Sequence, residues 1–409
     1  MTATDRPPSS AGQLLAEVLL TDFGAAGPYD GYRRLRELAP VLITGGRTLV
    51  LSRYADCDAV LRNRVIGKAD ESLGFRLSPI PEELRQRAAY RFRRTMLFRN
   101  PPDHTRLRRL VSSAFTGRHV EELRAAVVTQ IETLLDGLAE YDTVDIISEL
   151  ALPLPVGVIG DLLGVPEGER AAAAPLIRDM LAPLEPSSDA AAVARSAVAE
   201  DELAAYFADL LAAKRRRPAD DLLSRLATAR GADGLDDDEC VGSAILLFTA
   251  GFETTTNLIG NGLAALLAFP DQRELLRSRP ELALGAVEEL LRYDAPVQTD
   301  GRTVLEPTTV AGIECEPGRV ILMLLGAANR DPDRFSDPDR LDLTRSGSPN
   351  LAFGSGIHFC LGAHLARMEG AELFPRLLAR FPAITPAGEQ IWRSGLSFRG
   401  LQSLPVSLS

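Results

Sequence analysis

The stretch that decides the fold of this chain is Phe353-Gly354-Ser355-Gly356-Ile357-His358-Phe359-Cys360-Leu361-Gly362. It is a glycine-punctuated loop with one cysteine, and a helical pattern from Ala363 to Arg380 follows it at once. Glycine tolerates positive φ, so Gly354 and Gly356 let the backbone turn tightly and approach a flat or bulky group closely. Cys360 comes just before the helix, where free backbone N–H groups and the helix dipole favour an anion. The loop therefore predicts that Cys360 is a thiolate.

No second cysteine or histidine lies near Cys360 at a spacing typical of zinc sites. A lone thiolate is instead suited to be the single axial ligand of a haem iron. The alternative is a buried structural cysteine in a glycine-rich turn. The other three cysteines (Cys57, Cys240 and Cys315) lie far apart without a CxxC pair, which indicates small core residues in a reducing cytosol.

The loop resembles the haem-binding signature Phe-Gly-x-Gly-x-His-x-Cys-x-Gly of the cytochrome P450 monooxygenases, with every fixed position filled. The resemblance implies a mainly α-helical fold with small β-sheets, in which haem b lies between a long central helix and the helix that follows the cysteine loop. Cys360 would be the iron ligand, with Phe353, Gly354, His358 and Gly362 also at the cofactor. We expect a single haem-binding domain over residues 29–409, preceded by a flexible tail over residues 1–28.

Composition limits the other possibilities. The chain has 409 residues, of which 45% are hydrophobic, so it can bury a large core. Its net charge of −11 argues against binding to nucleic acid. The first twelve residues lack a basic region followed by an apolar run, and no stretch reaches the apolar length of a membrane helix. We expect a cytoplasmic monomer that does not bind a membrane.

Local patterns predict the order of the elements. The chain starts with a helix at 29–39, a hairpin at 40–52 and a helix at about 53–62, followed by an irregular segment over 64–99. Residues 100–103 open a helix, and the pattern stays helical to about residue 280, including a long apolar helix at about 237–268. Strand-like runs return at 302–323, an irregular Pro-rich stretch follows at 329–350, and the last 25 or so residues form strands and turns.

A polar turn interrupts the long apolar helix at Ala250-Gly251-Phe252-Glu253-Thr254-Thr255. Thr254 can donate back to the Ala250 carbonyl and open a groove beside Gly251, where Glu253 and Thr254 could relay protons. The alternative is a helix whose Gly and Thr pack against a neighbour and whose Glu faces solvent. The segment resembles the oxygen-activation motif of the same family, which makes Ala250, Gly251, Glu253 and Thr254 the predicted catalytic residues.

Two further sets of residues match family positions. Glu289 and Arg292 are three apart on one helix face and can pair, and the family places a structural Glu-Arg pair here whose third partner would be Arg345 or Asn329. Haem propionates need cations or hydrogen-bond donors. The family positions that contact them correspond to His104, Arg108, Arg302 and His358, whereas His119 and His364 match nothing.

Substrate-facing residues are expected, by family position, at Leu246, Leu247, Ala250, Val297 and Gln298 and within 64–99 and 394–398. The segment 85–94 holds five arginines. They are either a solvated helix paired with acidic side chains or a contact for a negatively charged substrate or carrier protein.

The predicted function is insertion of one oxygen atom from O2 into a hydrophobic small molecule, by hydroxylation or epoxidation, in the tailoring of a secondary metabolite such as a polyketide, macrolide or peptide. The substrate could be carrier-bound. Electrons would come from NADPH or NADH through a separate ferredoxin or flavodoxin and its reductase. The alternatives are a haem-thiolate enzyme of another reaction type (ring coupling or peroxide-driven), a haem-binding sensor and a helical scaffold without haem.

Overall fold

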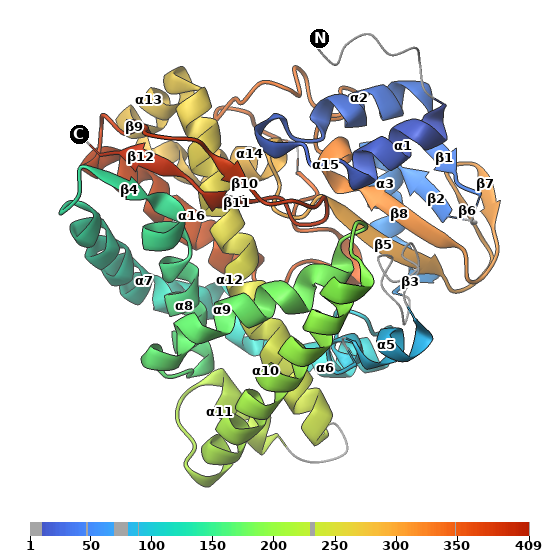
Figure 1. Cartoon of the computed structure of the whole chain (residues 1–409), viewed down its shortest axis with the longest axis horizontal. Helices are drawn as coiled ribbons and strands as arrows, with labels where there is room; N and C mark the ends of the chain where they lie inside the picture. The colour runs from blue at the N-terminus through green and yellow to red at the C-terminus, as the bar shows by residue number, and fades with distance from the viewer. Residues whose placement is uncertain are drawn as a thin grey trace.

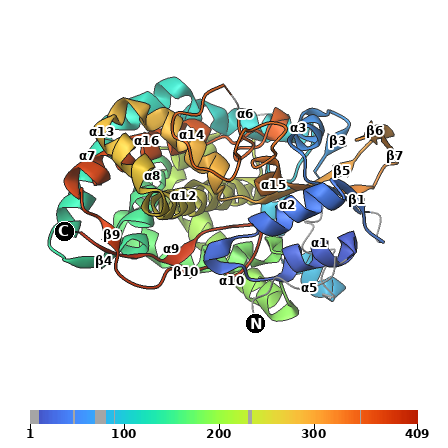
Figure 2. The same ribbon diagram turned by 90° about the horizontal axis from the view of Figure 1, so that it is seen from above.

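One long helix, α12 (Asp237–Ala268), forms the centre of the molecule, as Figures 1 and 2 show. The computed structural model describes residues 10–45, 48–68, 81–88, 90–229, 234–347 and 349–408. The start of α12 is fixed by a reciprocal capping box: the Glu239 N–H donates to the Asp236 carboxylate at 2.7 Å, and the Asp236 N–H donates to the Glu239 carboxylate at 3.1 Å. These bounds match the prediction from the sequence.

The sequence makes α12 a core helix because it is apolar on all sides. Its residues are buried from Cys240 to Thr249 and again from Thr255 to Leu267. Between these runs, Ala250 is exposed and Gly251 and Thr254 are partly exposed. The polar turn singled out in the sequence is thus the place where the central helix opens to a space.

The other helices surround α12 on both sides (Figure 2). Those that contact it most are α8 and α10 on one side and α13, α14 and α16 on the other, while α9 packs on α8 and α10. The helices are α1 (Ala11–Leu20), α2 (Tyr29–Leu38), α3 (Tyr54–Arg62), α5 (Glu82–Arg87), α6 (Asp103–Ser112), α7 (Gly117–Leu138), α8 (Pro153–Leu163), α9 (Glu167–Leu181), α10 (Ala190–Arg216), α11 (Leu222–Thr228), α13 (Pro270–Ser278), α14 (Ala283–Tyr293), α15 (Leu325–Ala328) and α16 (Ala363–Arg380).

The strands of the described residues form four small sheets. The largest has the order β1-β2-β8-β5-β3, in which β2 and β8 are parallel, with Leu49 opposite Ile321, and the other neighbours are antiparallel. The strands are β1 (Val41–Ile43), β2 (Thr48–Leu51), β3 (Ile66–Gly67), β4 (Thr143–Asp145), β5 (Thr299–Val304), β6 (Thr308–Val310), β7 (Ile313–Cys315), β8 (Val320–Leu324), β9 (Thr385–Pro386), β10 (Ile391–Trp392), β11 (Leu401–Ser403) and β12 (Pro405–Ser407). The predicted hairpin at 40–52 corresponds to β1 and β2.

The N-terminal segment differs from the flexible tail expected over residues 1–28. Helix α1 starts with its own capping box, between Ser10 and Gln13, and buries Leu14, Leu15 and Val18. These three side chains share a hydrophobic cluster with residues of α2, β2 and β8. The expectation is therefore wrong for residues 10–28, and residues 1–9 lie outside the described part of the chain.

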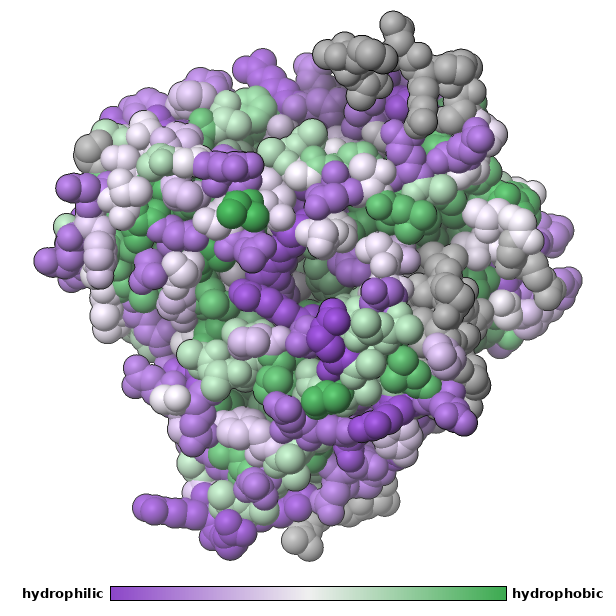
Figure 3. Space-filling view, in the orientation of Figure 1, coloured by the Kyte–Doolittle hydropathy of each residue, from purple (hydrophilic) through white to green (hydrophobic). Residues whose placement is uncertain are grey.

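Hydrophilic side chains cover most of the face shown in Figure 3, with apolar residues scattered between them. Within the described residues, no single helix is long and apolar enough to cross a bilayer. One bent pair, Ile147–Leu163 with Glu167–Leu184, meets the same test by length and composition only.

Candidate active site

The cysteine loop is closed by its own backbone. The Cys360 N–H donates to the Phe353 carbonyl at 3.0 Å, and the Gly354 N–H donates to the Leu351 carbonyl at 2.9 Å. Gly354 and Gly356 have φ values of +67° and +70°, as the sequence predicted. A side chain at Gly356 would meet the Leu61 carbonyl oxygen at 2.2 Å. The close approach at Gly356 is therefore to the end of α3, which fixes the loop against the β-sheet region.

The cysteine faces a mixed environment. Burial raises the pKa of the Cys360 thiol, whereas the N–H groups of Gly362 and Ala363 and the guanidinium groups of Arg108 and Arg367 lower it. Burial outweighs these groups, so the helix start alone does not produce the thiolate that the sequence predicted. A metal ion on the sulfur would supply the missing positive charge, because a coordinating thiol is deprotonated outright. Within the described residues, no cluster of three or more His, Cys, Asp or Glu side chains could by itself form a metal site.

A cavity of about 390 Å³ joins the cysteine loop to the polar turn of α12. Both Cys360 and Thr254 line it, so the two motifs that lie about a hundred residues apart in the sequence border one space. The rest of its lining is mostly apolar. It includes Phe92, Met96, Leu97, Leu181, Leu184, Leu246, Leu247, Val297, Leu365 and Phe398.

Two histidines in this part of the fold have buried, unpartnered ring nitrogens. The rings of His104 and His358 lie 4.3 Å apart between centroids, and the Nε2 atom of each lacks a hydrogen-bond partner. Burial and the neighbouring Arg108 lower the pKa of His104 to about 4. Burial and nearby cations, Lys68 first, lower the pKa of His358 well below its usual value. Both rings are therefore neutral near pH 7.

The predicted arginines lie at the same cavity. Arg108 lines it and donates to the Phe359 carbonyl at 2.7 Å, and Arg302 lines it and pairs with Asp300 at 2.6 Å. A haem placed against Cys360 needs partners for its propionates, and unpartnered imidazole nitrogens beside two guanidinium groups are such partners. The residues present therefore fit haem.

Sequence reasoning missed Lys68 and Asp300. The Lys68 ammonium lies 2.6 Å from the Asp300 carboxylate, and both side chains line the cavity. Burial raises the pKa of Asp300, but Arg302 and Lys68 outweigh it and hold that pKa well below its usual value. Lys68 stands alone at the edge of the irregular 64–99 segment, and no spacing pattern marks it. Asp300 is two residues from Arg302, which is the one signal that could have found it.

In the polar turn of α12, the predicted hydrogen bond of Thr254 is present, but the predicted opening of the helix is not. The Thr254 hydroxyl donates to the Ala250 carbonyl at 3.0 Å, although the helix stays unbroken through this turn. A side chain at Gly251 would meet Ile159 of α8 at 2.4 Å, so Gly251 allows α8 to pack closely. Thr254 and Gly251 both line the cavity.

Glu253 does not face solvent. Its side chain is 3% exposed and pairs with Arg393, which comes from the turn after β10, while its Oε2 atom is buried without a partner. Arg178 of α9 is close enough for both groups to influence its pKa, which burial lowers. Neither Arg393 nor Arg178 was predicted, because no pattern in the sequence links them to the α12 motif.

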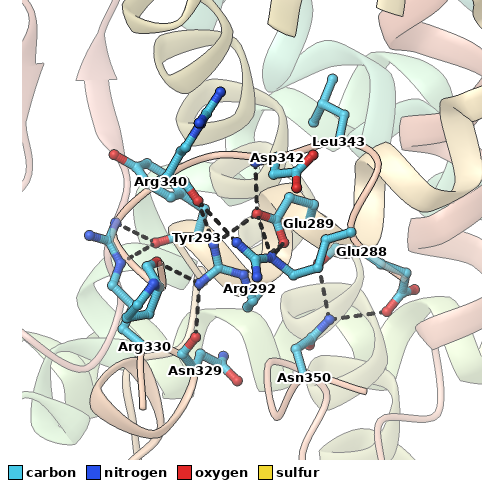
Figure 4. A network of polar contacts seen from close by, with 12 residues as sticks. Glu288, Glu289, Arg292, Tyr293, Asn329, Arg330, Arg340, Asp342, Leu343 and Asn350 are labelled. Carbon is cyan, nitrogen blue, oxygen red and sulfur yellow. Dashed lines mark hydrogen bonds and ion pairs between the residues drawn. The ribbon is translucent and has the colours of Figure 1, made fainter. Parts of the chain in front are cut away.

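Glu289 and Arg292 form a buried pair, as Figure 4 shows. The Arg292 Nε atom lies 2.7 Å from the Glu289 carboxylate, and both side chains are 2% exposed. Of the two candidate third partners, Arg345 provides the charged contact, with its Nε atom 3.1 Å from Glu289. Asn329 contributes its backbone carbonyl, which accepts from Arg292 at 3.0 Å. Arg292 also donates to the carbonyls of Pro338 and Arg340. The pair therefore binds α14 to the irregular stretch 329–350.

The predicted substrate-facing residues divide into two groups. Leu246, Leu247, Ala250 and Val297 line the cavity. Gln298 does not, and this prediction is wrong: its side chain is fully buried and donates to the Ala295 carbonyl at 2.8 Å and to the Tyr29 hydroxyl at 3.3 Å. Val297 and Thr299 both line the cavity, and the side chain of Gln298 between them points the other way, as side chains alternate along an extended chain.

The arginine-rich segment pairs with acidic side chains of the same chain. Arg87 lies 2.9 Å from Asp201, Arg91 lies 3.3 Å from Asp238, and Arg94 lies 3.0 Å from Asp236. For these three arginines, the contacts agree with the interpretation that the segment pairs with acidic side chains of the same chain. The side chain of Arg85 lies outside the described residues.

Comparison with known proteins finds relatives along nearly the whole chain. Residues 172–405 match the family model described as Cytochrome P450. The vitamin D(3) 25-hydroxylase of Pseudonocardia autotrophica is 40% identical over 93% of this chain and 94% of its own. The 6-deoxyerythronolide B hydroxylase of Saccharopolyspora erythraea is 37% identical over 93% of this chain and 96% of its own. The crystal structure of P450BioI in complex with an acyl carrier protein ligated to hexadec-9Z-enoic acid matches with a TM-score of 0.85 and 33% identity, over 94% of this chain and 99% of that one.

Proposed function

This chain belongs to the cytochrome P450 family and is a P450 monooxygenase, and from that premise we propose that it hydroxylates or epoxidises an apolar secondary metabolite such as a polyketide, macrolide or peptide. The observation that carries the proposal is that Cys360 and Thr254 line one and the same cavity. One wall offers an iron ligand, and another offers a hydroxyl on an otherwise apolar helix. This arrangement suits oxidation of a molecule held between them.

The cofactor of the family is haem with a thiolate ligand. Haem b held by Cys360 would supply the activation of oxygen, with electron donation from the thiolate favouring O–O cleavage. Arg108, Arg302, His104 and His358 would hold its two propionates. Arg108, Arg302 and His358 line the cavity, His104 packs against His358, and both histidines have an unpartnered Nε2 atom. Phe353, Gly354 and Gly362 line the cavity beside the sulfur and leave room for a flat group.

Protons would reach the cavity through the polar turn of α12. The Thr254 hydroxyl lies at the cavity and can donate there while it is not bonded to the Ala250 carbonyl. Glu253 is the adjacent carboxylate, and its unpartnered oxygen can accept a proton. Arg393, whose side chain is 17% exposed, connects this carboxylate to the surface. We assign Glu253 and Thr254 as the proton relay and Arg393 as the residue that positions Glu253.

The cavity lining indicates the chemical class of substrate. Aromatic and branched aliphatic side chains dominate, so most of the substrate must be apolar. Two buried hydroxyls, those of Thr249 and Thr303, lack a hydrogen-bond partner, and both residues line the cavity. A buried polar atom without a partner costs stability. A carbonyl or hydroxyl oxygen on the substrate would satisfy it, which agrees with an oxygenated natural product.

We propose a free substrate rather than one tethered to a carrier protein. The structure of P450BioI contains a carrier protein. In this chain, however, Arg87, Arg91 and Arg94 are already paired with aspartates. Electrons would come from NADPH or NADH through a separate ferredoxin or flavodoxin and its reductase. The protein would be located in the cytoplasm.

The test is a spectroscopic titration of the purified haem protein. A panel of macrolides, other polyketides, peptides, steroids and fatty acids is added, the fatty acids both free and linked to an acyl carrier protein. We expect a shift of the haem spin state with a free oxygenated natural product. Turnover with ferredoxin, reductase and NADPH must then give a product heavier by one oxygen atom. A spin shift only with carrier-linked acids, or a coupled product without added oxygen, would contradict the proposal.

Substitutions at two separate cysteines test the assignment of Cys360 as the iron ligand. Cys360→Ser should lose the thiolate-type absorption of the reduced, CO-bound protein, whereas Cys315→Ser should keep it. Cys315 lies on β7 and does not line the cavity. A normal thiolate spectrum in Cys360→Ser would overturn the assignment.

A further inference from the structure

Two segments far apart in the sequence meet over the cavity. The end of α9 and its connection to α10 contribute Leu181, Leu184 and Pro186 to its lining, and the loop before β11 contributes Ser397 and Phe398. Figure 1 shows the turn between α9 and α10 beside the loop that joins β10 and β11. These two segments form one wall of the proposed substrate site.

The wall is thin at this place. Leu184 and Pro186 line the cavity, but Ser187 is exposed to solvent and Glu185 is partly exposed. On the other segment, Ser394 is exposed while Ser397 lines the cavity. In both segments, residues exposed to solvent thus lie within a few residues of those that line the cavity.

A single carboxylate holds the two segments together. Glu185 accepts backbone hydrogen bonds from three successive residues: Leu396 at 2.8 Å, Ser397 at 2.8 Å and Phe398 at 2.9 Å. The Ser397 hydroxyl adds one bond in the other direction, to the Leu184 carbonyl at 2.9 Å. Backbone N–H groups that converge on one anion form a geometrically specific clamp.

Gly395 makes room for the clamp. Its φ is +117°, a conformation that side chains rarely adopt. A Cβ atom at this position would lie 2.7 Å from the carboxyl carbon of Glu185 and 2.8 Å from one of its oxygens. The residue before the three donors thus has to be glycine if the carboxylate is to reach them.

The clamp has only moderate strength. Burial raises the pKa of Glu185, and the N–H groups of Ser397, Phe398 and Leu396 oppose the effect without cancelling it. Among the described residues, Glu185 has no ion-pair partner, so its charge is stabilised by dipoles alone. Such a contact can hold two segments together and still release them during a catalytic cycle.

We propose that Glu185 is a positioning residue that latches the α9–α10 connection to the loop 395–398, and that release of this latch sets how fast bulky molecules enter and leave the cavity. The inference rests on the proposed function, because it assumes that the cavity is the substrate site. It adds the residue that holds these two segments together over the cavity.

The test measures ligand exchange by stopped-flow absorption of the ferric haem protein, with econazole as a bulky azole and imidazole as a small one. Glu185→Ala should raise both the association and the dissociation rate of econazole by about tenfold, because opening no longer breaks charge-assisted hydrogen bonds. Imidazole rates should stay within about twofold. Glu185→Gln keeps an acceptor oxygen and should exchange econazole almost as slowly as the wild type.

Two further variants separate the latch from general loosening. Gly395→Ala should reproduce the fast econazole exchange of Glu185→Ala without any change at residue 185. Glu202→Ala removes the same charge from an exposed position on α10 and should exchange like the wild type. Unchanged econazole rates in both latch variants, or an equal rise for imidazole, would overturn the latch. Absence of a haem spectrum in the wild type would instead overturn the proposed function.

Discussion

At Thr254 one hydroxyl decides how a proton can reach an otherwise apolar cavity. We expect Thr254→Ala to bind haem normally and to consume NADPH, but to release peroxide in place of most of the product. The reason is that the hydroxyl donates only to the Ala250 carbonyl in the structure and so contributes little to the fold. The measurement is product and peroxide formed per NADPH.

Two matched variants accompany this prediction. Thr254→Ser keeps the hydroxyl and should keep most of the coupling. Thr255→Ala removes the neighbouring hydroxyl, which makes only a long bond of 3.4 Å to the Gly251 carbonyl, and should behave like the wild type. Equal product yield in Thr254→Ala and the wild type would show that the relay runs elsewhere.

Glu369 on α16 has a property that no motif announces. Its side chain is 1% exposed, its Oε2 atom has no partner, and burial raises its pKa from 4.5 to about 8. Between these two values the folded state holds a proton that the unfolded state has released. Stability should therefore fall as the pH rises through this window, because unfolding releases this proton and a higher pH favours the release.

We expect Glu369→Gln to remove part of this pH dependence. At about pH 8 the variant should be more stable than the wild type, and at about pH 5 the two should match within ~0.5 kcal/mol. Urea unfolding at both pH values is the measurement. Glu306→Gln, at an exposed position, is the control and should leave the free energy of unfolding unchanged at both pH values. Identical pH profiles for Glu369→Gln and the wild type would contradict the assignment.

Individual residues were predictable from the sequence where a short spacing encodes the geometry. The Thr254 hydroxyl is four residues from its acceptor, so a helix alone brings the two together. Arg393 and Lys68 could not be found in this way. Each meets its partner across a separation of more than a hundred residues, and only the packing of the whole chain defines the contact.

At the scale of elements, the Glu289–Arg292 pair on α14 organises an irregular stretch that has no regular hydrogen bonding of its own. Arg345 connects that stretch to the pair, with bonds to Glu289 and to the Ser336 carbonyl. We expect Arg345→Met to lower the free energy of unfolding by about 1–3 kcal/mol, since it removes charge-assisted bonds from a mostly buried side chain. Arg292→Leu should cost more, about 3–5 kcal/mol, because it leaves Glu289 buried without its main partner.

The measurements are chemical unfolding and the rate of haem transfer to an apo-acceptor protein. Arg340→Met is the matched control: the Arg340 side chain is exposed, and only its backbone carbonyl takes part in the network. It should change stability by less than ~0.5 kcal/mol. If Arg345→Met were as stable as Arg340→Met, the contact between α14 and the stretch 329–350 would not depend on Arg345.

Elements with strong local signals were predicted closely, and those with weak ones were not. The bounds of α12 and α16 follow from a capping box, a glycine and a continuous apolar pattern. Helix α1 was missed although Ser10 and Gln13 form a capping box. It is only ten residues long, and its stability comes from a cluster whose other members are distant in the sequence.

At the scale of the whole molecule, α1 belongs to the cluster that joins α2 to the largest sheet. Leu14 is 2% exposed in this cluster, whereas Leu20 at the end of the same helix is 62% exposed. We expect Leu14→Ala to lower the free energy of unfolding by about 2–4 kcal/mol through the lost burial and the cavity left behind. Leu20→Ala should change it by less than ~0.5 kcal/mol. Equal effects of the two substitutions in urea unfolding would mean that α1 is not part of the folded core.

The parallel pairing of β2 with β8 has a consequence for how the protein is made. The two strands are separated by roughly 270 residues, so at about 5–20 residues per second the ribosome needs some tens of seconds to deliver the second after the first. During that time the β1–β2 hairpin has one edge unpaired, and unpaired edges attract other chains. The cysteine loop emerges later still. We therefore expect nascent chains to depend on chaperones and to take up their cofactor only after synthesis is nearly complete.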